Sequence, residues 1–408
     1  MQKDSVTEPV QQHIDKQEYI SSTVPLATQE EHRSGPYRYI LWLFTMTRVL
    51  LILVTYVGVI LLTAPKYSST PTYVHTLLLA WNHWDASNYV RIAQYGYQYV
   101  PDLAFFPLFP VCIWLISHIV GNYLLVGMLL SNLALLGALV IIYQLALDIV
   151  GEQVARRTLL YLCIFPTAFY FFAAYNEAFF LLFSSGAFLA MRRQRWLIAG
   201  ILGALAAGTR SAGIILVLPY LCEWWFSRQK NESTRIGVFL LKLVPICLIP
   251  FGLLAYSYYC LRTTGNPLMF ATVQTHWDRH AEWPWQGIGA SLYQLWVQPI
   301  GSFYQVHILI DLCATVGFLI LTVLGWRRLP LSFTLWSVSL LLLMLLNASP
   351  VGDPLASNQR LVLEIFPGFI LLALLGKEHP RLHETVLLVS LPLLATLSII
   401  FLMNRWMV

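Results

Sequence analysis

Long apolar stretches recur along most of this chain of 408 residues, separated by short segments that carry Lys and Arg. Hydrophobic residues make up 58% of the sequence and charged residues only 11%, whereas soluble domains carry about 25% charged residues. Only helices of about 20 apolar residues or closed barrels satisfy their backbone polar groups inside a lipid bilayer. The sequence therefore predicts an all-α polytopic membrane protein whose main partner is the lipid bilayer.

The polar ends and loops exclude several other classes. Residues 1–38 are rich in Gln, Glu, Ser and Thr and lack an apolar core, so we expect a disordered cytoplasmic tail rather than a signal peptide. Residues 39–408 are expected to form one transmembrane domain. The formal charge of +5 is explained by Lys and Arg of cytoplasmic loops, so no nucleic-acid partner is needed. The six cysteines are scattered singly, which argues against a disulfide framework.

The positions of basic residues, together with the number of spans between them, determine the expected topology. Basic residues precede the first span, 39–63, and place the N-terminus in the cytoplasm. If 105–120 were also a full span, Arg156 and Arg157 would fall on the external side. We therefore interpret residues 65–121 as one external region with interfacial helices.

The apolar segments along the whole chain give about eleven spans, most of them close to the length that a bilayer requires. They are 39–63, 123–149, 157–175, 177–191, 196–208, 212–226, 236–261, 303–325, 331–347, 360–376 and 384–404. The spans 196–208 and 212–226 are too short for ordinary crossings and predict a bent hairpin whose tip, at Arg210, enters a cavity open to the outside. The C-terminus and a second large loop, 262–302, are then also external.

Asp85 is the strongest candidate for chemistry. It is a lone carboxylate in the run Trp81-Asn82-His83-Trp84-Asp85, soon after the first span. A carboxylate placed in this way can act as the general base that takes the proton of a sugar-accepting hydroxyl. Aromatic rings such as Trp84 and Tyr89 stack on sugars and also suit a membrane interface. The alternative is that Asp85 caps the helix beginning near Ala86, and the two roles are compatible.

Arg210 and Arg360 are candidates for binding the phosphate of a lipid carrier, because guanidinium groups bind phosphate through paired hydrogen bonds. An arginine in an apolar hairpin usually faces a cavity or a partner, so Arg210 can equally form a structural pair with Glu177. For Arg360 the alternative is an ordinary pair with Glu364, four residues later on a helix.

Further candidates for substrate binding come from both external regions: Trp84, Tyr89, Arg91, Glu177, Gln274, His276 and Trp277. Glu177 can equally stabilise the positive end of the helix that it opens. The run from Gln274 to His280 can equally be a solvated interfacial loop. A metal site of His276, Asp278 and His280 is disfavoured, because Asp278 would project from a different helix face. Arg48 and Asp311, single charges within spans, are interpreted as buried structural partners.

Several motifs are absent from the sequence. It contains no Gly-x-x-x-x-Gly-Lys-[Ser/Thr] phosphate loop, which argues against ATP hydrolysis. It also contains no Asp-x-Asp pair of the kind that suggests a nucleotide-sugar and metal site. No inverted repeat like that of many transporters is evident.

Five groups of residues resemble the PIG-V mannosyltransferases. The motifs are Trp84-Asp85-Ala86 with Ala104 to Pro110, Phe165-Pro166-Thr167 with Tyr175-Asn176-Glu177, Gly208 to Gly213, Gly265 to Trp277, and Ser357 to Pro367. PIG-V enzymes are membrane proteins of the GT-C fold, and the eukaryotic member adds the second mannose of the GPI anchor. The resemblance covers most of the chain after about residue 38. Asn88 and Ala212 depart from the family pattern, which has His and Asn there.

The resemblance implies an inverting transfer of mannose from a polyprenyl-phosphate-linked donor, such as dolichyl phosphate mannose, to a hydroxyl of a glycolipid or glycan acceptor. It implies a base in the first external loop, which maps to Asp85, and an active site on the extracytoplasmic face. No cofactor and no metal are expected, and an accessory membrane subunit is compatible with the family. The alternatives are a lipid-glycan transporter or flippase that uses the same aromatic, basic cavity, and a non-catalytic homologue that acts as a subunit.

Overall fold

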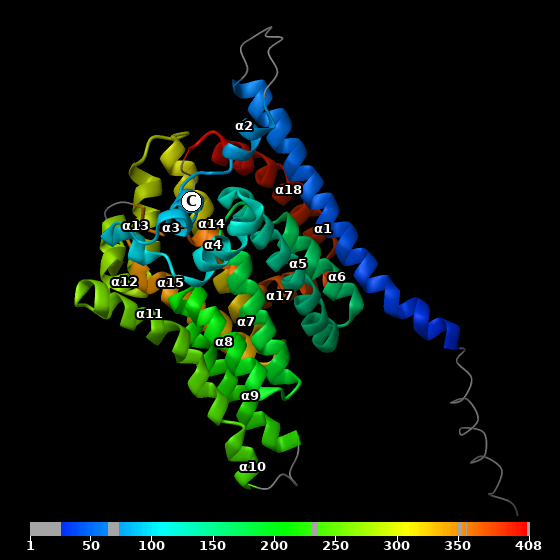
Figure 1. The fold of residues 1–408 in the computed structure, drawn as a ribbon. Coiled ribbons are helices and arrows are strands. Elements are labelled where there is room, and N and C mark those ends of the chain that lie inside the picture. Colours follow the sequence, from blue (N-terminus) through cyan, green and yellow to red (C-terminus); the bar gives the residue numbers. More distant parts are fainter. Residues whose placement is uncertain (1–25, 64–72, 231–235, 350–352, 356, 406–408) are drawn as a thin grey trace, which may run out of the picture.

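The computed structural model describes residues 26–63, 73–230, 236–349, 353–355 and 357–405. The described chain is almost entirely helical (Figure 1). Its α-helices are α1 (Leu26–Thr63), α2 (Val74–Leu79), α3 (Asp85–Tyr95), α4 (Leu108–Val120), α5 (Tyr123–Val150), α6 (Glu152–Ile164), α7 (Glu177–Arg192), α8 (Trp196–Thr209), α9 (Val217–Lys230), α10 (Ile236–Leu241), α11 (Ile249–Thr264), α12 (Met269–Thr272), α13 (Pro284–Val297), α14 (Phe303–Gly325), α15 (Leu331–Leu346), α16 (Asn358–Leu361), α17 (Phe366–Glu378) and α18 (Pro380–Leu402).

Shorter elements connect these helices at the places where the chain must turn. The 3₁₀ helices are η1 (Val100–Ala104), η2 (Ala168–Phe171), η3 (Ser211–Leu216), η4 (Val244–Leu248), η5 (Val273–Trp277) and η6 (Val362–Glu364). Two short strands, β1 (His280–Ala281) and β2 (Asn347–Ala348), pair antiparallel with His280 opposite Ala348. This strand pairing connects the loop after α12 to the segment that follows α15.

The prediction of an all-α, multi-pass membrane protein is confirmed. Within the residues described above, five helical segments are long and apolar enough to cross a bilayer: Gly35–Leu62, Tyr123–Val150, Phe239–Thr264, Phe303–Gly325 and Pro380–Leu402. Helices α4, α8 and α15 are apolar but shorter. The expected count of eleven spans is therefore not reproduced by helix length.

Several of the expected spans are interrupted, and two of these interruptions bear on the site. The segment 157–175 ends as a helix at Ile164, and the segment 360–376 becomes a regular helix only at Phe366. Phe165 precedes a proline, which disfavours helical backbone, and its φ of −53° and ψ of 143° are extended. The interruptions place Tyr170 on η2, Tyr175 just before α7 and Arg360 on the short helix α16, and all three are buried.

The prediction of a disordered tail over residues 1–38 was wrong for its last part. Residues 26–38 belong to α1 and are helical, and this stretch begins with good helix formers such as Ala27, Gln29 and Glu30. Residues 1–25 lie outside the described residues. Figure 1 shows α1 as a long helix along one side of the molecule, next to α18.

The turn that carries Arg210 is fixed by close helix packing. Helix α8 ends at Thr209, and η3 folds back against it. A Cβ added at Gly213 would lie 2.3 Å from the Ala207 nitrogen, so the returning backbone touches α8 without any side chain between them. Helix α11 approaches α8 in the same way at Gly252. The predicted bent hairpin with Arg210 at its tip is confirmed.

Candidate active site

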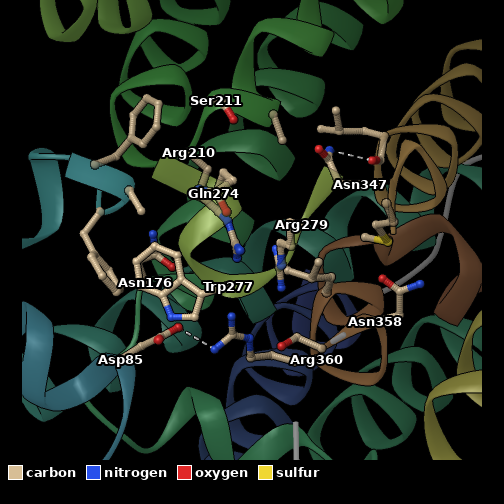
Figure 2. A pocket seen from close by; sticks show the side chains of 18 of the residues that line it. Asp85, Asn176, Arg210, Ser211, Gln274, Trp277, Arg279, Asn347, Asn358 and Arg360 are labelled. Atoms are coloured by element: carbon tan, nitrogen blue, oxygen red, sulfur yellow. Dashed lines mark hydrogen bonds and ion pairs between the residues drawn. The ribbon is translucent and has the colours of Figure 1, made fainter. Parts of the chain in front are cut away.

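A cavity of about 580 Å³ lies where the segments expected to be external meet. Its lining comes from α3 and the chain after η1, from the turn at Arg210, from the loop of α12 and η5, and from α15 to η6. Figure 2 shows side chains from these segments pointing into one space, among them Asp85, Arg210, Arg279 and Arg360. The cavity is therefore assembled from parts of the sequence that lie far apart.

Asp85 enters the cavity from the first turn of α3 and is bound by Arg360. Its Oδ2 accepts a hydrogen bond of 2.6 Å from Arg360 Nη1, and its side chain is 23% exposed. The expectation that Asp85 caps the helix was wrong: the helix begins at Asp85 itself, Trp84 is the N-cap, and no side chain caps it. The carboxylate faces the guanidinium group instead of the helix end.

Arg360 is almost completely buried between aromatic rings. The rings of Tyr170 and Tyr175 lie 5.5 and 5.4 Å from its guanidinium carbon. Besides Asp85, it contacts Glu177, whose Oε1 is 3.2 Å from Arg360 Nε. These carboxylates balance its charge, because a buried guanidinium without a counter-ion is strongly destabilising.

Arg210 is the second cation of this network. Its Nη1 donates to Glu364 and lies 3.3 Å from Glu177 Oε1. The expected Arg210–Glu177 pair is thus confirmed, and Glu177 bridges both arginines. The expected pair of Arg360 with Glu364 was wrong. The chain changes from α16 to η6 between these two residues, so they do not share a helix face.

The other candidate substrate-binding residues fall into two groups. Tyr89, Gln274 and Trp277 line the cavity, whereas Trp84, Arg91, Glu177 and His276 do not. Tyr89 packs edge-on against Phe105 and Phe109, and burial, reinforced by the charge of Asp85, raises its pKa well above the ordinary range. The Tyr89 hydroxyl is therefore neutral and can donate a hydrogen bond at physiological pH.

Arg91 forms a fork with Asp102 rather than lining the cavity. Its Nη1 and Nη2 lie 2.9 and 2.6 Å from the two carboxylate oxygens, and Nη2 also donates to Asn88. Asp102 in turn accepts the backbone N–H groups of Gln98 and Tyr99. These contacts tie α3 to the chain around η1.

The site also contains Arg279, which the sequence candidates did not include. Figure 2 shows its guanidinium pointing toward Arg360. Burial, reinforced by the positive charge of Arg360, lowers the pKa of Arg279 to about 10, so it is charged at neutral pH. The only sign of Arg279 in the sequence was its position in the run Trp277-Asp278-Arg279, close to residues predicted to bind substrate.

A second polar cluster lies beside the cavity. Among the described residues, His307, Asp311 and Asp353 are the only three His, Cys, Asp or Glu side chains placed closely enough to share a metal ion. Their contacts also have a structural explanation: His307 Nε2 lies 2.5 Å from Asp353 Oδ2, and Asp311 accepts the backbone N–H of Gln359 at 2.7 Å. The prediction that Asp311 is a buried structural partner is confirmed.

Arg48 was also expected to have a buried partner. Its Nη1 donates to Asn132 Oδ1 at 2.9 Å, and its guanidinium carbon lies over the rings of Phe44 and Phe172. This prediction is confirmed as well. Arg48 does not line the cavity.

Comparison with known proteins decides the family. Residues 37–294 match the family described as Mannosyltransferase (PIG-V), which is more than half of the chain. The chain belongs to the PIG-V mannosyltransferase family. It is 29% identical to GPI alpha-1,6-mannosyltransferase 2 of Cricetulus griseus, over 57% of this chain and 53% of that protein, and 31% identical to the Homo sapiens enzyme of the same name, over 50% and 46%. The chain thus spans about half the length of these relatives.

Solved structures show a distant likeness. The crystal structure of ArnT from Cupriavidus metallidurans bound to undecaprenyl phosphate matches with a TM-score of 0.49 and 13% identity, over 84% of this chain and 62% of that one. The apo oligosaccharyltransferase of Archaeoglobus fulgidus gives a TM-score of 0.44 and 12% identity, over 88% and 56%.

Proposed function

We propose that this PIG-V family member is an inverting mannosyltransferase of the GT-C type. It would move mannose from a polyprenyl-phosphate donor to a hydroxyl of a membrane glycolipid or glycan. The observation that carries the proposal is the carboxylate of Asp85, which Arg360 holds at the wall of a cavity that two further arginines also line. Membership in the family supports mannose as the sugar.

The chemistry requires one base and positive charge near the leaving group. The acceptor oxygen attacks the anomeric carbon from the face opposite the phosphate, and Asp85 takes the proton of that hydroxyl. The bond from the anomeric carbon to the phosphate oxygen breaks, and the phosphate leaves with the bonding electrons as a monoester. Arginines stabilise the charge that develops there, so no general acid is needed.

The contacts of Arg360 and Arg210 support these proposed roles. Arg360 fixes one oxygen of Asp85 and so orients the other toward a bound hydroxyl. Arg210 reaches both of its carboxylates through Nη1, which leaves the rest of its guanidinium for a ligand. We therefore retain both arginines as proposed contacts of the donor phosphate.

We further propose that the cavity opens on the extracytoplasmic face, or the luminal face of an internal membrane. The cavity is lined by parts of 65–121, 262–302 and the segment after α15, all of which the distribution of basic loops assigns to that face. The lipid carrier would then reach the site from the bilayer, and the acceptor from the same leaflet or the aqueous space.

The test replaces Asp85 by Asn in the purified protein and follows mannose transfer from polyprenyl-phosphate mannose to candidate acceptor lipids. We expect a loss of roughly 10²-fold or more in kcat, because a positioned base contributes about that much. Asp148→Asn, which removes an exposed carboxylate at the end of α5, is the matched control. Full activity of Asp85→Asn would contradict the proposal and favour a transporter or flippase. A wild-type protein without any transfer activity would favour a non-catalytic subunit.

A further inference from the structure

The motif Phe165-Pro166-Thr167 forms a fixed break between two helical elements. Helix α6 ends just before it, and η2 begins just after it. The ring of Phe165 packs edge-on against Phe318 of α14 and against Phe369 of α17. The break therefore has a defined place between two neighbouring helices, and so has the side chain of Thr167.

The hydroxyl of Thr167 reaches the backbone next to Arg360. It donates a hydrogen bond of 2.7 Å to the carbonyl oxygen of Gln359, which is 192 positions away in the sequence. The N–H of Gln359 is bound by Asp311 Oδ1, also at 2.7 Å. Thr167, Asp311 and Gln359 are all buried. Side chains from two other parts of the chain therefore hold the two peptide groups that flank the Gln359 Cα atom.

The helix that carries Arg360 is too short to hold its own position. Helix α16 has four residues, and a helix of this length has no stability of its own in isolation. It starts after Ser357, which has a left-handed φ of 66° and makes no side-chain cap. Asn358 adds a hydrogen bond of 3.1 Å to Thr315 Oγ1 of α14. The orientation of α16 thus depends on its contacts with α14 and with the segment at Thr167.

The segment that begins at Thr167 also contacts the Arg360 side chain. The N–H of Tyr170 bonds to the Thr167 carbonyl at 3.1 Å, and the rings of Tyr170 and Tyr175 lie 5.5 and 5.4 Å from the Arg360 guanidinium carbon. From this position the guanidinium binds Asp85 (Figure 2). A shift of α16 relative to this segment would displace the group that holds the proposed base.

We propose that Thr167 is a positioning residue for sugar transfer. Its hydroxyl holds the peptide group between Gln359 and Arg360, and it thereby keeps the Arg360 guanidinium on Asp85. The inference rests on the proposed function, and it gives a role to the motif Phe165-Pro166-Thr167, which does not line the cavity.

The kinetic experiment compares Thr167→Val and Thr167→Ser with Thr158→Val. Thr158 is the matched control, because it is equally buried and its hydroxyl donates to a carbonyl of its own helix, α6. We expect Thr167→Val to lower kcat for mannose transfer by about 10-fold or more, since small displacements of reacting groups have effects of this size. Thr167→Ser keeps the donor and should retain most of the activity. Thr158→Val should have the wild-type kcat.

A double variant tests whether Thr167 acts through Arg360. Arg360→Lys keeps the charge but loses the planar guanidinium that contacts Asp85. If Thr167 acts by placing that guanidinium, adding Thr167→Val to Arg360→Lys should lower kcat by only about 2-fold or less, because the two effects are not additive. The same loss of kcat in both backgrounds would show that Thr167 acts independently of Arg360 and would overturn the inference.

Hydrogen exchange separates this inference from the proposed function, because it requires no activity. We expect the backbone N–H groups of residues 358–363 to exchange about 3-fold or more faster in Thr167→Val, but not in Thr158→Val. Unchanged exchange and unchanged kcat in Thr167→Val, with a wild type that transfers mannose, would overturn the inference alone. A wild type without transfer would overturn the proposed function, and faster exchange would then still support the contact that holds α16. If Thr167→Val does not fold, Thr167→Ala is judged by the same criteria.

Discussion

Arg360 Nη1 lies 2.6 Å from Asp85 Oδ2, although 275 positions of the sequence separate the two residues. The pair joins α3 to α16, which precedes the C-terminal helices. Glu177, at the start of α7, contacts the same arginine from a third part of the chain. Asp85, the proposed base, can be held in this orientation only after these distant segments have packed together.

Removal of Arg360 should therefore cost stability as well as activity. In Arg360→Gln, Asp85 and the buried Glu177 each lose a counter-ion, and we expect the free energy of unfolding to fall by about 3 kcal/mol or more. Adding Asp85→Asn removes one of the orphaned charges and should restore part of the stability but none of the transferase activity. Thermal unfolding in detergent and a mannose-transfer assay test both parts. Equal stability of Arg360→Gln and of the double variant with Asp85→Asn would contradict the coupling between the two residues.

The close contact between α8 and α11 gives a second prediction. A Cβ at Gly252 would lie 2.1 Å from the Ala204 carbonyl oxygen, and backbone cannot move aside as a flexible side chain can. Gly252→Ala should lower the free energy of unfolding by about 1–3 kcal/mol through overpacking and should disturb the Arg210 turn. Gly317→Ala in α14 is the control, since nothing lies within 4 Å of the added Cβ. A similar melting temperature for both variants would argue against this packing.

The sequence predicted those features that depend on local composition. Apolar length predicted the helical membrane class, and the shortness of 196–208 and 212–226 predicted the turn at Arg210. Asp85 and the arginines could be selected because single charges are conspicuous among apolar residues.

Pairing between distant residues could not be predicted in this way. Glu364 is four residues from Arg360, yet it binds Arg210, 154 positions away. Spacing of four residues brings side chains together only while the helix continues, and the change to η6 had no clear signal in the sequence. Arg279 was missed for a related reason, because a ladder of two residue pairs, rather than a periodic pattern, fixes its position.

Arg91 should prove to be a structural residue. Burial tends to raise the pKa of Asp102, but hydrogen bonds from Arg91 and the Tyr99 N–H outweigh it and hold the pKa below its usual range. Arg91→Gln should lower the free energy of unfolding by about 1 kcal/mol, a modest value because the arginine is partly exposed. The donor KM should stay unchanged, and a raised KM with normal stability would instead support a role in substrate binding.

The same pair predicts a pH dependence of stability. A carboxyl group with a lowered pKa in the folded state stabilises the protein above its unfolded pKa, and this contribution is lost as the pH falls through the folded value. The wild-type melting temperature should therefore drop below about pH 4. Asp102→Asn should be less stable at neutral pH and lose less on acidification. If the melting temperatures of the two proteins fell in parallel as the pH is lowered, Asp102 would not contribute to the pH dependence of stability.

Metal removal distinguishes two interpretations of the His307, Asp311 and Asp353 cluster. Asp311 Oδ1 accepts the N–H of Gln359, the residue before Arg360, so the cluster can act by holding α16 in place. We expect chelation with EDTA to leave mannose transfer unchanged, whereas Asp311→Ala lowers both activity and melting temperature because that N–H loses its acceptor. Recovery of activity on adding Zn²⁺ or Mn²⁺ after chelation would show a functional metal site instead. The binding of Arg360 to Asp85 would then depend on an ion as well as on the protein chain.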